Sequence, residues 1–151
     1  MANPTTYSFK DLTGAFAHPS AGSYILSGNI GAGQITISML TEKTVTEMSA
    51  DGSPMVSYVA GDNGTVSIEC NQTSQLHKFL LGWFNSVNMA AKNGDVSNWT
   101  NAALTFRSLV DGTGHICTGG APAKIPDKVY AAQGGKITWV IPFADIQHST
   151  F

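Results

Sequence analysis

The chain has 151 residues, a length that is typical of one domain with a single hydrophobic core. Charged residues make up only 12% of it, about half of the usual share for a soluble domain, and the formal net charge is -2. This composition excludes a disordered chain, which needs more charge, and it disfavours tight nucleic-acid binding, which needs clustered Lys and Arg.

The first half of the chain predicts β-strands, because apolar and polar residues alternate there between glycines and prolines. The alternation is clearest in two segments, whose apolar members are Ile35, Ile37 and Met39 in the first and Val66, Ile68 and Cys70 in the second. Weaker patterns predict strands at residues 7–12, 22–27, 44–48 and 55–59.

The next segment predicts an amphipathic α-helix at about residues 74–92. Its apolar residues recur at spacings of three and four and share one face: Leu76, Phe79, Leu80, Trp83, Phe84 and Val87. Thr73 or Ser74 can cap the first amides, and Asn93-Gly94 supplies a left-handed stop. Burial contributes about 1.5–3 kcal/mol for each large side chain before entropy is subtracted, so we expect this helix to cover an apolar sheet face.

Strand patterns return after the helix. Residues 104–107 and 137–143 alternate clearly, and Pro142 predicts a strand end or a sheet edge because proline donates no ladder hydrogen bond. A weaker strand is predicted at residues 115–118, inside a Gly- and Pro-rich run at 112–136 that is the best candidate for a long irregular loop. The sequence thus predicts one mainly β domain, residues 1–151, with a single helix.

No pattern identifies a catalytic, cofactor or metal site. Cys70 and Cys117 lack CxxC spacing and are expected to be reduced core thiols, and the scattered histidines are expected to be solvated or at the edge of the core. A small hydrolase built around His115 or His148 with a nearby Asp is the weakest alternative, since no nucleophile elbow positions a hydroxyl beside a base. We also expect no membrane-spanning segment and no secretory signal.

Three segments, YSFKDLTGAFAHP, GAGQITISM and SADGSPMVSYVAGDNGTVSIECNQTS, together resemble the tail tube proteins of contractile-tailed bacteriophages. The resemblance spans most of the chain and is most specific between Ala50 and Val66. It implies a β-sandwich or barrel of the tail tube type, flanked by the one helix and similar to related secretion-tube proteins. It further implies a structural protein that is not an enzyme and binds no cofactor.

The same resemblance implies self-assembly into stacked hexameric rings that form the inner tube of the tail, a conduit for DNA ejection into the host cell. The implied partners are other copies of the chain, the tail sheath protein, the tape-measure protein, and the baseplate initiator and tail terminator proteins. DNA would pass transiently and without specificity. The implied location is the virion, after assembly in the cytoplasm of a bacterial host.

Two assembly surfaces are expected on this basis. The hairpin at about residues 41–64 would be a protruding arm whose contacts with neighbouring copies or the next ring come from Met48, Asp51, Met55, Val56 and Tyr58. A hairpin folded back on its own domain is the alternative. The second surface is a polar sheet face that would line the conduit, formed by Gln34, Thr36, Ser38, Thr65, Ser67 and Glu69. The pattern leaves open which sheet face turns inward.

An alternative hypothesis, which places the chain in a different functional class, is a ligand-binding β-sandwich such as a carbohydrate-recognition module. It would use Trp99, Tyr130 or Tyr24 as exposed stacking platforms and would be a stable monomer.

The sequence does not determine what the loop at residues 112–124 contacts, which can be a sheath, a neighbouring subunit or solvent.

Overall fold

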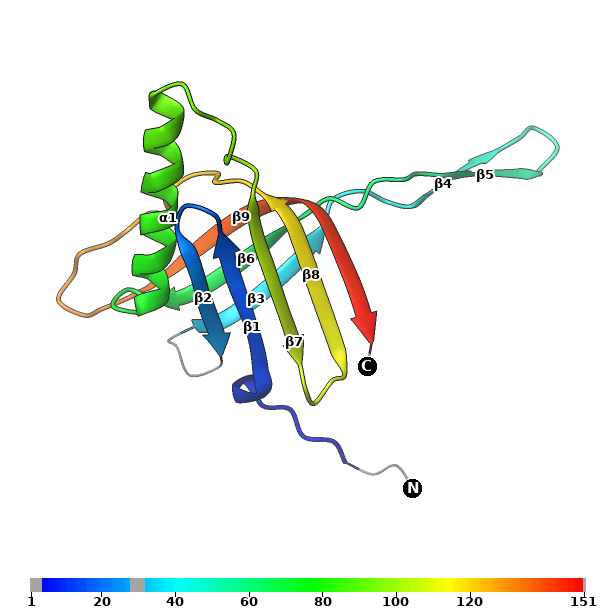
Figure 1. Cartoon of the computed structure of the whole chain (residues 1–151). Coiled ribbons are helices and arrows are strands. Elements are labelled where there is room, and N and C mark those ends of the chain that lie inside the picture. Colours follow the sequence, from blue (N-terminus) through cyan, green and yellow to red (C-terminus); the bar gives the residue numbers. More distant parts are fainter. Residues whose placement is uncertain (1–3, 28–31, 151) are drawn as a thin grey trace.

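The computed structural model describes residues 4–27 and 32–150, most of which build one curled, seven-stranded antiparallel sheet (Figure 1). Across the sheet the strand order is β2-β1-β7-β8-β9-β6-β3. In chain order these strands are β1 (Leu12–His18), β2 (Gly22–Ser27), β3 (Ala32–Met39), β6 (Gly64–Asn71), β7 (Ala102–Ser108), β8 (Thr113–Gly120) and β9 (Lys136–Thr150). A separate two-stranded sheet contains β4 (Thr44–Met48) and β5 (Pro54–Tyr58). The mainly β prediction is confirmed.

The sheet curls at β9, which has fifteen residues and pairs with a different strand along each half. Its residues 136–143 pair with β6, and its residues 143–150 pair with β8. Pro142 lies at the junction, so the prediction of an edge or a strand end there is wrong. Its carbonyl accepts a hydrogen bond from the Ala121 amide at 3.1 Å. Because the N and C=O of one strand residue point to the same side, the missing N–H faces the loop beyond β8 and costs no ladder bond.

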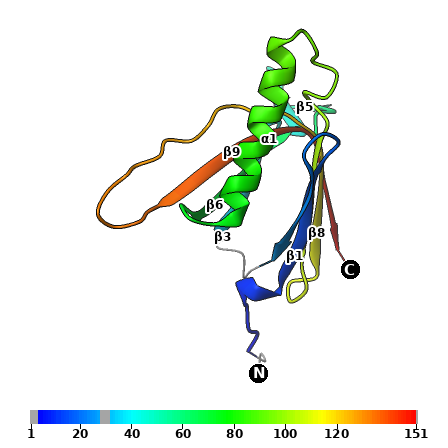
Figure 2. The same cartoon turned by 60° about the vertical axis from the view of Figure 1, so that its left-hand side comes forward.

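The helix α1 (Gln75–Lys92) covers the open side of the curled sheet (Figure 2). On its predicted face Leu76, Leu80, Trp83 and Val87 are buried, and Phe79 and Phe84 are partly buried against the same core. The predicted ends are also observed, since the Ser74 hydroxyl accepts a hydrogen bond from the His77 amide and Gly94 has a φ of 87°.

Aromatic contacts attach α1 to both halves of the sheet. The rings of Phe79 and Trp83 lie 5.9 and 5.1 Å from that of Phe16 on β1, measured between ring centroids. On the other half, the ring of Phe84 lies 6.4 Å from that of Trp139 on β9. Edge-to-face aromatic pairs add to the free energy gained from burial alone. The helix therefore fills the space between the two halves and holds them apart.

Two histidines are buried, although the sequence suggested solvated or core-edge positions. The Trp139 indole N–H donates to Nδ1 of His77 at 3.1 Å, and burial lowers the pKa of His77, with a smaller contribution from Lys128. His18 is buried as well, with the Ser20 amide donating to its Nδ1 at 3.1 Å and its Nε2 lying 2.8 Å from the Asn98 carbonyl. Each imidazole therefore links two segments that are distant in sequence through a polar contact.

Both cysteines are buried free thiols, as expected. Burial raises the pKa of Cys70, and it raises the pKa of Cys117 to about 11. Both groups therefore stay protonated and poorly nucleophilic near neutral pH.

Two local predictions are wrong. The strand expected at residues 7–12 is a 3-10 helix, η1 (Phe9–Asp11), and β1 begins only at Leu12. The irregular loop expected at residues 112–136 starts with β8, so that only residues 121–135 lack regular structure. The glycines that suggested a loop are needed inside the strand, because a Cβ at Gly120 would come within 2.5 Å of the Phe143 ring. The other predicted strands agree with the structure in position.

Replacing Trp83 with Ala should lower the free energy of unfolding by about 3–5 kcal/mol, because the cavity would lie between the two halves of the sheet. Met89→Ala is the control on the same helix, since Met89 is 63% exposed, and it should change stability by less than about 0.5 kcal/mol. Urea unfolding of both variants measures the difference. Equal losses would show that α1 does not bridge the sheet.

Stability should decrease as the pH falls through the ordinary histidine value of 6.5, because the unfolded chain then binds protons that buried His77 resists. We expect the thermal midpoint of unfolding to fall between about pH 7.5 and about pH 5.5, and His77→Gln to make that decrease shallower. A variant that keeps the full slope would contradict this role for His77.

Candidate assembly surfaces

The first candidate surface is the β4–β5 hairpin, hereafter the arm, which projects away from the curled sheet (Figure 1). Every residue of both strands is exposed, so the arm does not fold back onto its own sheet in this structure. Its large apolar side chains are between 46% and 80% exposed: Val45, Met48, Met55, Val56 and Tyr58. A two-stranded hairpin alone is marginally stable in water, and an exposed apolar patch of this kind indicates a binding surface.

Strand pairing divides the arm into two faces. Val45 lies opposite Ser57 and Glu47 opposite Met55, which places these four residues on one face. The alternate positions form the other face: Thr44, Thr46, Met48, Pro54, Val56 and Tyr58. One face therefore combines apolar contact area with a single carboxylate, and the other is mainly apolar.

The tip and the base of the arm are held by local hydrogen bonds. At the tip, the Asp51 carboxylate accepts from the amide and the hydroxyl of Ser53 at 3.0 and 2.6 Å, and these bonds lower the pKa of Asp51. At the base, Lys43 forms an ion pair with Asp62 and lowers its pKa. The Val59 amide also donates to the Lys43 carbonyl at 2.9 Å. Asp51 thus stabilises the turn at the tip, and the contacts at the base fix the direction in which the arm leaves the sheet.

The second candidate surface is the polar side of β3 and β6. Register places three cross-strand pairs there: Gln34 with Glu69, Thr36 with Ser67, and Ser38 with Thr65. All six side chains lie on the side of the sheet facing away from α1, because the intervening residues point into the core. The face continues onto β9, where the Lys136 ammonium lies 3.5 Å from the Glu69 carboxylate.

The two ends of the curled sheet are a third feature relevant to assembly. In the described part of the chain, β2 and β3 each pair with one strand only. Each therefore presents backbone N–H and C=O groups along its outer side, which can pair with another strand. The sheet is curled but open.

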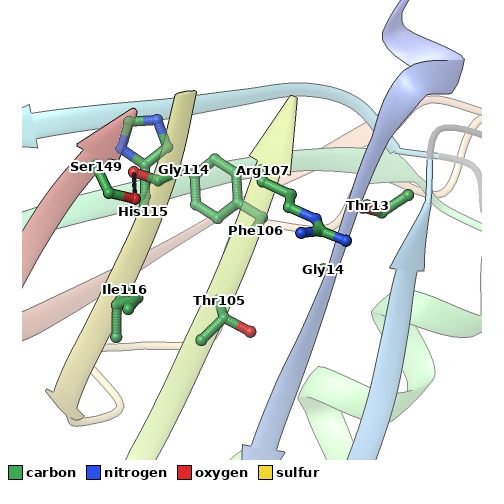
Figure 3. Close-up of a pocket in the computed structure, with 9 residues that line it drawn as sticks. All are labelled: Thr13, Gly14, Thr105, Phe106, Arg107, Gly114, His115, Ile116 and Ser149. Atoms are coloured by element: carbon green, nitrogen blue, oxygen red, sulfur yellow. Dashed lines mark hydrogen bonds between the residues drawn. The ribbon is translucent and has the colours of Figure 1, made fainter. Parts of the chain in front are cut away.

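A groove of about 480 Å³ lies on the outer side of the sheet at the ends of β1, β7, β8 and β9 (Figure 3). Register aligns four residues across it: Thr13, Arg107, Gly114 and Ser149. Thr105 and Ile116 form the next row and lie beside each other on β7 and β8 (Figure 3). The alternation of residues along single strands gives no sign of this groove, because only the strand pairing brings these residues together.

The structure brings His115 and His148 together, which the sequence did not predict. Their Nδ1 atoms are 2.8 Å apart across the β8–β9 pair. Burial lowers the pKa of His115, and the proximity of His148 lowers it further. Within residues 4–27 and 32–150 no group of three or more His, Cys, Asp or Glu residues is arranged to hold a metal ion.

The aromatic platforms expected of a carbohydrate module do not form a common surface. Tyr24 is half-buried with its ring 5.2 Å from that of Phe79, and Trp99 packs partly buried against the core. Only Tyr130 is well exposed, at 82%. The expectation of three exposed platforms is therefore wrong for Tyr24 and Trp99, because both are used for packing.

The described residues contain no helix that combines the length and the apolar character needed to cross a membrane.

Comparison with protein-family models finds a match over residues 4–150 to the family described as Bacteriophage PhiTE tail tube protein. Comparison with curated proteins finds no match.

Solved structures similar to this chain come from contractile injection systems. A chain from the PVC sheath/tube terminator of an extracellular contractile injection system has a TM-score of 0.63 at 7% identity, covering 99% of this chain and 100% of that one. A chain from the PVC sheath-tube complex has a TM-score of 0.60 at 9% identity, covering 98% of this chain and 93% of that one. A chain from the anti-feeding prophage baseplate has a TM-score of 0.60 at 9% identity, covering 99% of this chain and 98% of that one. The tail-tube-type fold predicted from the sequence is confirmed.

Proposed function

The chain belongs to the bacteriophage PhiTE tail tube protein family, and we propose that it assembles into stacked hexameric rings forming the inner tube through which DNA leaves the phage. The family is structural and non-enzymatic, so the resemblance seen in the sequence and the expectation of no catalysis are both confirmed. The chain is a component of a phage tail. The observation that carries the proposal is the family match over residues 4–150.

Ring formation is supported by the open ends of the curled sheet. We propose that the free side of β2 in one copy meets the free side of β3 in the next, so that both sets of backbone groups are paired. Repetition of this contact around a rotation axis removes every exposed sheet edge within a ring. The sixfold order follows from the family resemblance rather than from any distance within one chain.

The polar face of β3 and β6 is our proposed lining of the tube. Its side chains are short and mostly uncharged, and Glu69 offsets the charge of Lys136 at 3.5 Å. Each phosphate paired with Lys or Arg would release counterions and add affinity that slows passage. A neutral to slightly acidic lining therefore suits a conduit that must not retain DNA.

The remaining partners are proposed from the family and from the assemblies that contain similar folds. These assemblies include a sheath-tube complex, a sheath/tube terminator and a baseplate. We propose contacts with a tail sheath protein outside, a tape-measure protein inside, and initiator and terminator proteins at the ends of the tube. Assembly would take place in the cytoplasm of the bacterial host.

The purified chain should form rings or tubes, visible by negative-stain microscopy, that depend on the arm. Replacing residues 44–58 with a short Gly-Ser linker should abolish tubes, because it removes the exposed apolar side chains of the arm. The denaturation midpoint should stay near that of the intact chain, since neither arm strand belongs to the buried core. Tubes formed by the linker variant would contradict a role of the arm in assembly, and a strict monomer of the intact chain would contradict the proposed function.

Replacing both Thr36 and Ser38 with Lys should leave the tubes intact. It should reduce DNA delivery by the assembled phage about tenfold or more, because each added cation pairs with the phosphates of the passing DNA. The control places the same two charges on the exposed side of α1, at Asn85 and Met89. Infectivity per assembled particle measures the difference. Equal infectivity of the two variants would assign the lumen to another face.

A further inference from the structure

We propose that the arm of one copy docks into the groove on a copy in the next ring, with Glu47 of the arm paired with Arg107 of the groove. This inference rests on the proposed function, because it names the contact that stacks one ring on another. It commits to a second copy of the chain as the occupant of the groove.

The arm and the groove are different surfaces of the chain, and the strands of the arm project away from the sheet that carries the groove. The arm leaves the sheet beside Gly64, which pairs with Phe143 of β9, whereas the groove lies at Ser149, near the other end of the same strand half. The base of the arm also contacts β9 at Asp62, whose carbonyl accepts from the Ile146 amide at 2.9 Å, and Ile146 is three residues, about 10 Å of extended strand, from Ser149. Figure 1 shows the arm leaving at the end opposite the β7–β8 turn and the C-terminus. A contact between two unlike surfaces is heterologous, and it can repeat along an axis as an open stack.

The two surfaces match in chemistry. The groove is mainly apolar, with Ile116 50% exposed and Gly114 without a side chain, and Arg107 reaches across it toward Thr13 on β1 (Figure 3). The facing side of the arm offers Val45 and Met55 for the apolar part and one carboxylate for the cation. A flexible Met side chain adapts well to a shallow apolar surface.

The charged pair is specified by the acidic residues of the arm. Asp51 lies in the turn, where its Oδ1 accepts from the amide and the hydroxyl of Ser53, and it belongs to neither arm strand. Glu47 is the acidic side chain of the arm strands and shares its face with Met55. A guanidinium carries five N–H donors, so Arg107 can bind a carboxylate while keeping contacts within its own chain.

Charge reversal tests this pairing. Glu47→Arg alone places two cations together at every stacking contact, and Arg107→Glu alone places two anions together, so neither purified variant should form sedimentable tubes. An equimolar mixture of the two variants restores opposite charges at every contact between unlike chains. We expect tubes to return in the mixture, which also shows that both variants are folded.

The outcomes separate this inference from the proposed function. Tubes formed by either single variant, or no recovery in the mixture of two folded variants, overturn the docking inference while tubes of the intact chain still support the proposed function. Glu42→Arg, which reverses an exposed carboxylate at the base of the arm, is the matched control and should form tubes alone.

Cross-linking gives an independent readout. With Cys at both Met55 and Ile116, oxidised tubes should yield a ladder of covalent multimers on a non-reducing gel, since each chain contributes one arm and one groove. The native thiols should not interfere, because Cys70 and Cys117 are buried. The control pairs Cys at Ile116 with Cys at Val56, on the opposite face of the arm, and should give no ladder. A ladder from the control alone would assign docking to the other face.

Discussion

The curl of the seven-stranded sheet depends on α1, whose aromatic side chains stand between its two halves. Phe79 and Trp83 contact Phe16 on β1, and Phe84 contacts Trp139 on β9, so the halves cannot approach each other. Close packing makes this wedge effective, because large buried rings leave little room for rearrangement. Within residues 4–27 and 32–150 the sheet is accordingly not closed into a barrel, and β2 and β3 each have one side that no strand pairs with. The way the core is filled therefore leaves open the two strand edges that the proposed ring contact would pair.

The composition of the chain has a structural explanation in the same terms. Low charge suits surfaces that other subunits cover, since charged residues are depleted in the cores of interfaces. The ion pairs found among the described residues occupy specific places: Lys43 with Asp62 at the base of the arm, and Lys136 with Glu69 on the polar face. One pair directs the arm, and the other offsets a cation on the proposed lining.

Local patterns predicted the elements whose side chains alternate or recur clearly, including β3, β6, β7, β9 and α1. They failed where the determinant was non-local. The small residues of β1 give little alternation, and the glycines of β8 resemble a loop until Phe143 is placed beside Gly120. Pro142 suggested an edge because nothing local shows that β9 changes partners there. The groove and the contact between the imidazoles of His115 and His148 also depend on strand register, which no single segment shows. The hairpin at about residues 41–64, by contrast, was predicted from the turns in its own sequence.

The two sulfhydryl groups bear on the life of a phage after release. Outside the bacterium the surroundings are oxidising, and reactive thiols there form adducts and unwanted cross-links. In this chain Cys70 and Cys117 are shielded by the core, and burial raises the pKa of Cys117 to about 11. Neither offers the thiolate that such reactions need. Both thiols can therefore stay reduced when the protein passes from reducing to oxidising surroundings.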